Sequence, residues 1–216
     1  MIELVPPLIA GLAVTLQLTL GGALLGTVAA LIAGLLRLSR TAPVRWLAAS
    51  YIEVFRGTSA LVQLFWFYFV LPLFGVSLEA TTVGVLVLGL NSGAYGAEVV
   101  RGAILAVPKG QWEAAVSLNL SRWSTMRRII LPQAVPAMLP PAGNLLIELL
   151  KNTALVSLIT ITDLTFSAQI LRAETLKTTE IFSLVLLMYF SAAMVIALLM
   201  RMLERCLSRA QGRAVA

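Results

Sequence analysis

Histidine is absent from this sequence, and charged residues of either sign are scarce. The 216 residues include no His and one Cys (Cys206), and Asp, Glu, Lys and Arg together make up 12% of the chain. The missing histidine removes the commonest general base and the commonest neutral metal ligand. A lone cysteine cannot form a disulfide within the chain. We therefore predict neither a catalytic residue nor a metal site.

Apolar residues are correspondingly abundant. They form 59% of the chain without counting glycine, against about 45–50% with glycine in ordinary soluble domains. Several windows exceed the ~18 apolar residues typical of a membrane-spanning helix. We predict an all-α integral membrane protein whose residues 1–216 form a single transmembrane domain. The opening MIELVPPLIAG has no Lys or Arg before its apolar run, so we expect the first helix to be retained and not cleaved as a signal peptide.

Five apolar stretches are long enough to cross a bilayer, and together they predict a five-helix transmembrane bundle. A further helical stretch, 45–57, precedes the second span and is expected to lie partly at the membrane interface. The predicted spans are residues 8–36, 60–74, 82–105, 134–158 and 181–203.

The basic residues predict how the bundle is oriented. Thirteen of the sixteen Lys and Arg residues fall in the connections after spans one and three and around the C-terminus. Arg172 and Lys177 fall on the other side, and Lys151 lies within span four. Because basic loops stay in the cytoplasm, we predict the N-terminus outside and the C-terminus in the cytoplasm. The net charge of +6 then reflects membrane topology, and nucleic-acid binding is the poorer explanation.

A polar, basic segment, EAAVSLNLSRWSTMRRIILP (113–132), interrupts the apolar pattern between spans three and four. Pro108 is suited to start a helix, Asn119 tolerates the left-handed conformation that ends one, and Ser121 is suited to cap the next. We predict a helix–turn–helix elbow, residues 108–132, on the cytoplasmic surface. A membrane-surface helix whose arginines meet anionic lipid is the simpler alternative, but it does not explain the Ala-Ala pair or the turn. The residues expected on one side of the first helix are Trp112, Ala115 and Val116.

The elbow resembles the signature loop of permease subunits of ATP-binding-cassette (ABC) importers. That loop reads Glu-Ala-Ala, three residues, Gly, nine residues, Ile, one residue, Leu-Pro. Asn119 stands where the family has glycine, and we expect it to keep the left-handed turn. The residues at the family spacing are Glu113, Ala114, Ala115, Asn119, Ile129, Leu131 and Pro132.

Four further stretches are similar to the branch of this family that takes up polar amino acids. They are TLQLTL, EVFRGTSALVQLFWFYFVLP, SGAYGAEVVRGAILAVPKGQWEAA and LLKNTALVSLITITDL. The branch usually has Pro after FRGT, where this chain has Ser59. The resemblance covers nearly the whole chain.

The resemblance implies a fold and a set of partners. It implies a type I importer permease, with the elbow as a cytoplasmic coupling helix that docks on a separate, dimeric ABC ATPase. It also implies a second permease copy or a sister permease, an extracytoplasmic solute-binding protein, and a place in the bacterial inner membrane among its lipids. ATP and Mg are expected on the ATPase, because this chain has no G-x-x-x-x-G-K-[ST] loop and is expected to hold no cofactor.

Polar side chains within the spans are the candidates for a substrate path, since such residues are costly in a membrane. Glu148 and Asn152 lie four apart on span four and therefore share a face, where they could bind a zwitterion. Equally, Glu148 could be neutralised by Lys151, three residues on. Asn91 and Tyr95 share a face of span three.

Three other polar residues of the spans, Gln63, Glu98 and Arg101, are also considered as path or structural residues. Gln63 on span two is a further path candidate, although hydrogen bonding between helices is the more common role of such residues. Glu98 and Arg101 are expected to form a structural pair near the cytoplasmic end of span three.

We therefore expect a non-catalytic permease subunit of an ATP-driven importer for polar amino acids or related zwitterionic solutes, working by alternating access. Ectoine, a compatible solute, is the alternative substrate. A membrane-embedded enzyme is disfavoured by the absence of His and of paired carboxylates. A passive channel subunit would not need a coupling elbow, and no filter-like glycine run is present.

Overall fold

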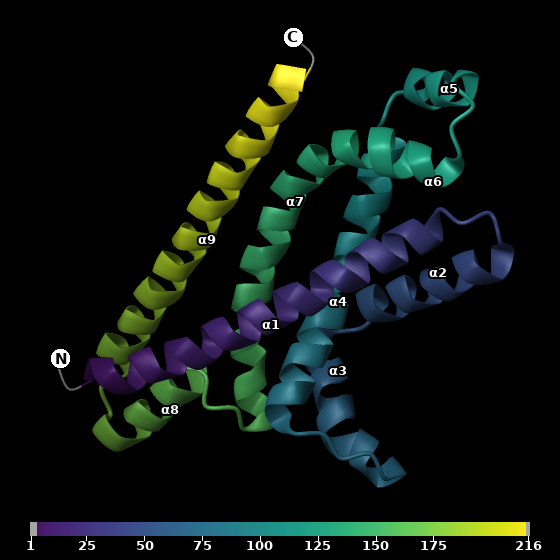
Figure 1. Cartoon of the computed structure of the whole chain (residues 1–216). Coiled ribbons are helices and arrows are strands. Elements are labelled where there is room, and N and C mark those ends of the chain that lie inside the picture. Colours follow the sequence, from purple (N-terminus) through teal and green to yellow (C-terminus); the bar gives the residue numbers. More distant parts are fainter. Residues whose placement is uncertain (1–3, 215–216) are drawn as a thin grey trace.

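Apolar residues surround the long helices on all sides, as expected where lipid is the solvent. The helix near the N-terminus has a mean hydropathy of 2.0 over its best window, and the C-terminal one reaches 2.5 with only 11% of that window buried. The computed structural model describes residues 4–214, and within that range all regular structure is helical (Figure 1).

Four helices are long and apolar enough to cross a membrane, and a bent pair forms a fifth candidate span. The predicted spans 8–36, 82–105 and 181–203 each lie within one of these helices, so those three predictions are confirmed. The four helices are α1 (Val5–Arg37), α4 (Ala80–Leu105), the continuous stretch Arg122–Ile159 that contains α7 (Leu131–Asn152), and residues Thr178–Leu207 of α9 (Thr178–Ala214).

The bent pair accounts for span two and the helix before it. α2 (Ala42–Gly57) is followed at 103° by α3 (Ala60–Phe65), which continues through η2 (Trp66–Val70) and η3 (Leu71–Phe74). The chain turns at Thr58 and Ser59, which are both extended. The predicted helix at 45–57 and the helical stretch at 60–74 are both present, and together they form the fifth candidate span.

Span four starts earlier than predicted and ends, as predicted, near residue 158. The helical stretch starts earlier than residue 134, because α6 (Arg122–Thr125) and η4 (Met126–Ile130) run directly into α7. The α-helix also ends at Asn152, and the chain tightens into the 3₁₀-helix η5 (Thr153–Ile159). Thr153 donates its hydroxyl hydrogen bond to the Leu150 carbonyl (2.6 Å) at this junction.

One helix, α8 (Leu164–Thr175), was not predicted. Asp163 caps it by accepting a hydrogen bond from the Phe166 N–H (2.9 Å), and its buried side includes Leu164, Ala168 and Leu171. The Asp-x-x-Phe start and the spacing of four and three between those apolar residues were visible in the sequence. The helix is short and amphipathic, so a search for long apolar runs missed it.

Small residues bring α1 and α4 together along most of their length. A Cβ added at Gly26 would lie 3.0 Å from the Gly89 carbonyl oxygen, and one added at Gly34 would lie 2.8 Å from that of Ala97. Such close backbone approach is the usual role of glycine in membrane helices. Gly21 and Gly22 also make close contacts, Gly21 with Val85 and Gly22 with Leu149.

The two ends of the bundle differ. Figure 1 shows α5 (Lys109–Ser117), α6 and the C-terminal end of α9 on one side, which we call the elbow side, and α8 with the start of α9 on the other. α4 and α7 cross the space between these ends, and their facing sides carry the polar groups described next.

Candidate functional site

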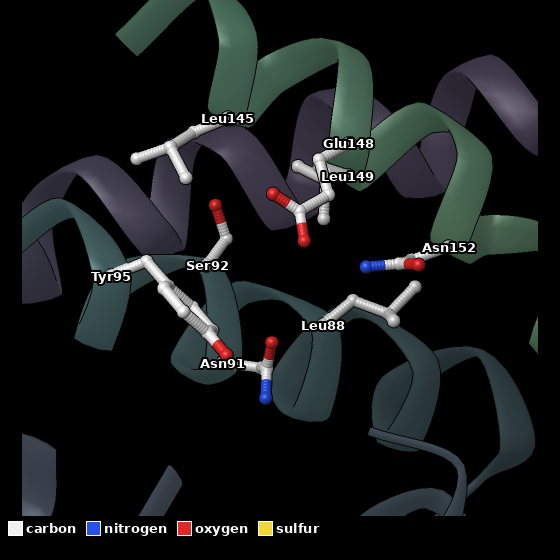
Figure 2. A pocket seen from close by; sticks show the side chains of 8 residues that line it. All are labelled: Leu88, Asn91, Ser92, Tyr95, Leu145, Glu148, Leu149 and Asn152. Atoms are coloured by element: carbon white, nitrogen blue, oxygen red, sulfur yellow. The ribbon is translucent and has the colours of Figure 1, made fainter. Parts of the chain in front are cut away.

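A small polar pocket lies between α4 and α7, within the apolar spans. Figure 2 shows Glu148 and Asn152 projecting from α7 towards α4, where Asn91, Ser92 and Tyr95 lie. Leu88, Leu145 and Leu149 complete the lining. Four of the five predicted path residues are therefore brought together by the fold, and Ser92 is an addition that sequence reasoning missed.

Glu148 keeps its carboxylate free of ion pairs. Among the side chains that the structure describes, Arg101 and Glu98 form the one salt bridge, with Arg101 Nε 2.9 Å from Glu98 Oε2. The predicted Glu98–Arg101 pair is thus confirmed, whereas the alternative Glu148–Lys151 pair does not form. Lys151 is exposed and does not line the pocket. An unpaired carboxylate inside a span is costly unless a ligand or water meets it.

Gln63, the fifth candidate, lies outside the pocket lining. Its Nε2 donates to the Phe55 carbonyl (2.9 Å) and to Thr58 Oγ1 (2.7 Å), and its Oε1 accepts from Asn91 Nδ2 (3.3 Å). Asn91 Nδ2 also donates to the Phe55 carbonyl (2.9 Å). The two amides therefore satisfy backbone groups left free where α2 ends, and hydrogen bonding between helices is the more common role of such residues.

Tyr95 connects the pocket to a cation on another helix. The Arg56 guanidinium lies over the Tyr95 ring, 5.2 Å from its centroid, in a cation–π arrangement. Arg56 is exposed near the end of α2. Its position in the sequence does not distinguish it from the other arginines near the membrane interface. The pocket thus has a carboxylate on α7 and, across Tyr95, a positive charge on α2.

The elbow turns as predicted. α5 ends at Ser117, Asn119 adopts φ 56° in the left-handed region, and the Leu120 N–H donates to the Ala115 carbonyl (3.0 Å). Ser121 then caps α6 by accepting from the Ser124 N–H (3.3 Å). Asn replaces the family's glycine because it is one of the few residues that enter this region at modest cost.

The side of α5 that carries Trp112, Ala115 and Val116 is only partly covered by the rest of the chain. Ala115 is fully buried and Trp112 is half-buried against the cluster around Ile104 and Ile130, whereas Val116 is 75% exposed. The outward side carries Glu113 and Ala114. Alpha-helical periodicity alone could not reveal which side the rest of the chain would cover. Large apolar residues exposed on the elbow are Val116, Leu118 and Trp123.

The remaining signature residues belong mainly to the internal packing of the chain. Ile129 and Leu131 pack against the buried cluster that includes Ile130 and Ala134, and Pro132 is exposed at the start of α7. Within the described range, no group of three or more Cys, Asp or Glu residues is placed to hold a metal ion.

The sequence matches known proteins over most of its length. The family described as "Binding-protein-dependent transport system inner membrane component" matches residues 26–209. The "Probable amino-acid ABC transporter permease protein y4tF" of Sinorhizobium fredii is 47% identical, over 95% of this chain and 89% of that protein. The "Glutamine transport system permease protein GlnP" of Escherichia coli is 39% identical, over 93% of each chain.

A solved structure is similar in fold as well as in sequence. The chain described as "Crystal structure of an amino acid ABC transporter with histidines" superposes with a TM-score of 0.88 at 40% identity, covering 95% of this chain and 96% of that one. The all-helical bundle is therefore of the type I permease kind, as the elbow motif predicted.

Proposed function

The chain belongs to the family of inner-membrane components of binding-protein-dependent transport systems, and from that premise we propose that it is the permease subunit of an ATP-driven importer of polar amino acids. Its relatives are permeases, which are non-catalytic subunits, and the family implies a separate ATPase and a solute-binding protein. The relatives lend no added support to ectoine or another compatible solute. ATP and Mg would bind the partner ATPase.

One observation carries this proposal: a polar pocket that contains a carboxylate lies inside apolar spans, and a cation lies beyond its Tyr95 wall. The Glu148 carboxylate suits the ammonium group of an amino acid, and Arg56, stacked on Tyr95, suits its carboxylate. Asn152 and Ser92 offer amide and hydroxyl groups to either end, and Asn91 offers its amide oxygen, since its Nδ2 donates to Phe55 and Gln63. A zwitterion would neutralise both charges at once, which lowers the cost of holding it within the membrane.

The elbow is the proposed contact with the ATPase. Its outward side presents Glu113 and Ala114, while Ala115, Ile129 and Leu131 fix it to the rest of the chain. A rigid, partly apolar surface at the end of α7 suits a lever, because movement of the elbow is passed directly to the helix that carries Glu148. ATP-driven closure of two ATPases would then reorient the pocket from one side of the membrane to the other.

The proposal extends to the assembly. We place the N-terminus outside and the C-terminus in the cytoplasm, with residues 1–216 as one transmembrane domain. One such bundle cannot enclose a path, so a second copy or a sister permease would complete it, with two ATPase subunits beneath. The solute-binding protein would select the amino acid and deliver it from outside.

Reconstitution tests the function directly. The permease, its ATPase and its binding protein are placed in liposomes, and ATP hydrolysis and uptake of labelled amino acids and ectoine are measured. We expect hydrolysis to be stimulated by the loaded binding protein, and uptake of a polar amino acid to require ATP. Uptake that proceeds without ATP would instead indicate a passive channel, and chemical change of the solute would indicate an enzyme.

A further inference from the structure

Gln63 and Asn91 connect the break between α2 and α3 to the wall of the polar pocket. Both residues are buried, with 8% of each exposed. Asn91 lines the pocket, whereas Gln63 lies behind it, outside the lining. A side-chain amide has a donor end and an acceptor end, so the hydrogen bonds of these two residues decide which end of Asn91 faces the pocket.

The hydrogen bonds at the break fix the orientation of the Gln63 amide. Thr58 Oγ1 donates its proton to the Val54 carbonyl (2.7 Å), so its oxygen acts as an acceptor towards Gln63. Gln63 Nε2 lies 2.7 Å from Thr58 Oγ1, 2.9 Å from the Phe55 carbonyl oxygen and 3.3 Å from the Thr58 carbonyl oxygen. The reverse orientation would place Gln63 Oε1 against two carbonyl oxygens. Gln63 therefore turns its NH2 group to the break and its Oε1 to α4.

The orientation of Gln63 in turn fixes that of Asn91. Asn91 Nδ2 donates to Gln63 Oε1 (3.3 Å) and to the Phe55 carbonyl (2.9 Å), which uses both of its N–H groups. The Asn91 oxygen is then the end of the amide that remains for the pocket. Figure 2 shows this oxygen on the side that faces Glu148, with the nitrogen turned away.

The pocket consequently has hydrogen-bond acceptors on two walls. Asn91 presents its amide oxygen from α4, and Glu148 presents from α7 a carboxylate that forms no ion pair with any described side chain. An ammonium group has three N–H donors and no acceptor, so it can donate to both walls at once. If the Asn91 amide were reversed, its NH2 group would face the ammonium and one of these bonds would be lost.

We infer that Gln63 is a positioning residue for substrate binding. It holds the Asn91 oxygen towards the pocket, where Asn91 and Glu148 together bind the ammonium group of the transported amino acid. The inference rests on the proposed function, because it takes this pocket as the substrate site. Gln63 does not touch the substrate, yet it favours solutes that carry an ammonium group over analogues of similar shape that lack one.

Three variants separate the orientation of Asn91 from the stability of the break. Gln63→Met removes both ends of the amide, so Asn91 loses its acceptor and the break loses its donor. Gln63→Glu keeps an oxygen that accepts from Asn91 Nδ2 but lacks the NH2 group that bonds Phe55 and Thr58. Thr58→Val removes a hydroxyl from the break and leaves the bond between Gln63 and Asn91, so it is the matched control. All three should lower the thermal unfolding midpoint, and only Gln63→Met should release Asn91.

Binding is measured on the complex of permease and ATPase in nanodiscs, without the binding protein, so that selection by that protein does not enter. The probe is labelled L-glutamine, and the competitor is glutaramic acid, which is glutamine without its α-ammonium group. L-arginine and L-glutamate are tested in the same way against their deaminated analogues. We expect Gln63→Met to weaken binding of the amino acid about tenfold and to reduce its preference over the deaminated analogue by a similar factor.

Gln63→Glu and Thr58→Val should keep the native affinity and preference although they are less stable, and Thr58→Val makes this comparison even where Gln63→Glu does not assemble. A positioning role therefore separates affinity from stability. Affinities that fall in step with the unfolding midpoint across the variants would overturn the inference, because Gln63 would then act only on the stability of the break.

A measurement without any ligand tests the orientation itself. The chain contains four asparagines, so isotope-labelled asparagine gives few side-chain amide signals in NMR spectra, and the signal missing from Asn91→Ser is that of Asn91. We expect its NH2 protons to exchange slowly with water in the native protein and in Thr58→Val, and at least tenfold faster in Gln63→Met. Fast exchange in the native protein would overturn the inference whatever the variants do. If no amino acid binds the native complex and none is taken up, the proposed function fails, and the exchange rates still decide whether Gln63 orients Asn91.

Discussion

At the scale of single residues, Glu148 is the side chain with the clearest consequence. It is an unpaired carboxylate in the polar pocket, and Lys151 does not neutralise it. We expect Glu148→Gln to reduce uptake roughly tenfold or more, since a hydrogen bond to a charged group contributes about 1.5–3 kcal/mol. Uptake and the yield of assembled complex are measured separately.

Two further variants make the Glu148 experiment decisive. Glu79→Gln, at the exposed start of α4 and outside the pocket, should transport normally. Glu148→Gln/Lys151→Met should remain inactive. Full recovery of uptake in that double variant would mean that Glu148 serves only to balance Lys151, and ligand binding by Glu148 would be ruled out.

Ionisation of the Asp163 carboxyl lowers the stability of the folded state. It is buried, and this burial raises the pKa of its carboxyl above the usual range, while hydrogen bonds from Phe166, Thr165 and Tyr189 act in the opposite direction. The folded state therefore holds the proton more tightly than the unfolded state. The stability gained in this way is present at low pH and is lost as pH rises through the folded-state pKa.

Two substitutions of Asp163 should distinguish how its helix cap affects stability from how the charge of its carboxyl affects stability. Asp163→Asn keeps the acceptor for the Phe166 N–H but cannot ionise, so its stability relative to the native chain should increase as pH rises from about 4 towards 8. Asp163→Ala should cost about 0.5–2 kcal/mol through loss of the α8 cap. Thermal unfolding midpoints at pH 5 and pH 8 measure both effects, and parallel pH profiles for the Asp163→Asn variant and the native protein would contradict the assignment of the charge.

At the scale of elements, the elbow places two neighbouring alanines in different surroundings. Ala114 faces outward and Ala115 is fully buried. We expect Ala114→Trp to leave the permease stable but to abolish stimulation of ATP hydrolysis, because the bulky ring stands where the ATPase approaches. Ala115→Trp should instead lower the yield of folded permease, since overpacking a buried site costs about 1–3 kcal/mol.

The Ala114→Trp and Ala115→Trp variants are controls for each other, because one changes an exposed residue and the other a buried one. Pull-down of the ATPase and thermal unfolding of the permease are measured on each. Normal ATPase binding and uptake by Ala114→Trp would remove this face of the elbow from the contact. Ser117→Trp, on the exposed final turn of α5, tests whether the contact extends beyond Ala114.

The break between α2 and α3 also depends on contacts between helices. Gln63 and Asn91 come from different helices and both donate to the Phe55 carbonyl, which the bend leaves without a helical partner. Polar residues in spans therefore have two roles here. Gln63 satisfies the backbone at the break, Glu148 and Asn152 face the pocket, and Asn91 does both.

At the scale of the whole molecule, the distribution of basic residues predicts which way the bundle faces. In a Cys206→Ser background, Arg122→Cys should react with an impermeant maleimide only after the membrane is opened, and Glu174→Cys should react in intact cells. Both positions are exposed, on α6 and α8, at opposite ends of the bundle (Figure 1). Labelling of both from the same side would contradict the orientation and, with it, the cytoplasmic elbow.

The sequence by itself determined where the long helices lie, although not all of their limits, because a bilayer requires about 20 consecutive apolar residues whatever their neighbours are. It also determined the left-handed turn at Asn119 and the cap at Ser121, since these depend on local backbone preferences. The residues of the pocket could be named in part, because Glu148 and Asn152 lie one turn apart on the same helix.

Only the tertiary structure decided what each polar or small side chain faces. Gln63 satisfies a helix break and Arg56 lies over Tyr95, and in both cases the partner lies on another helix. Ala115 is fully buried, which its position in the sequence did not show. Predicting α8 also required knowledge of how the helices pack, because a short amphipathic helix is stabilised by the surface it packs on. Apolar length is a property of one segment, whereas contact between helices depends on how all the segments pack, and that is why the sequence could not supply it.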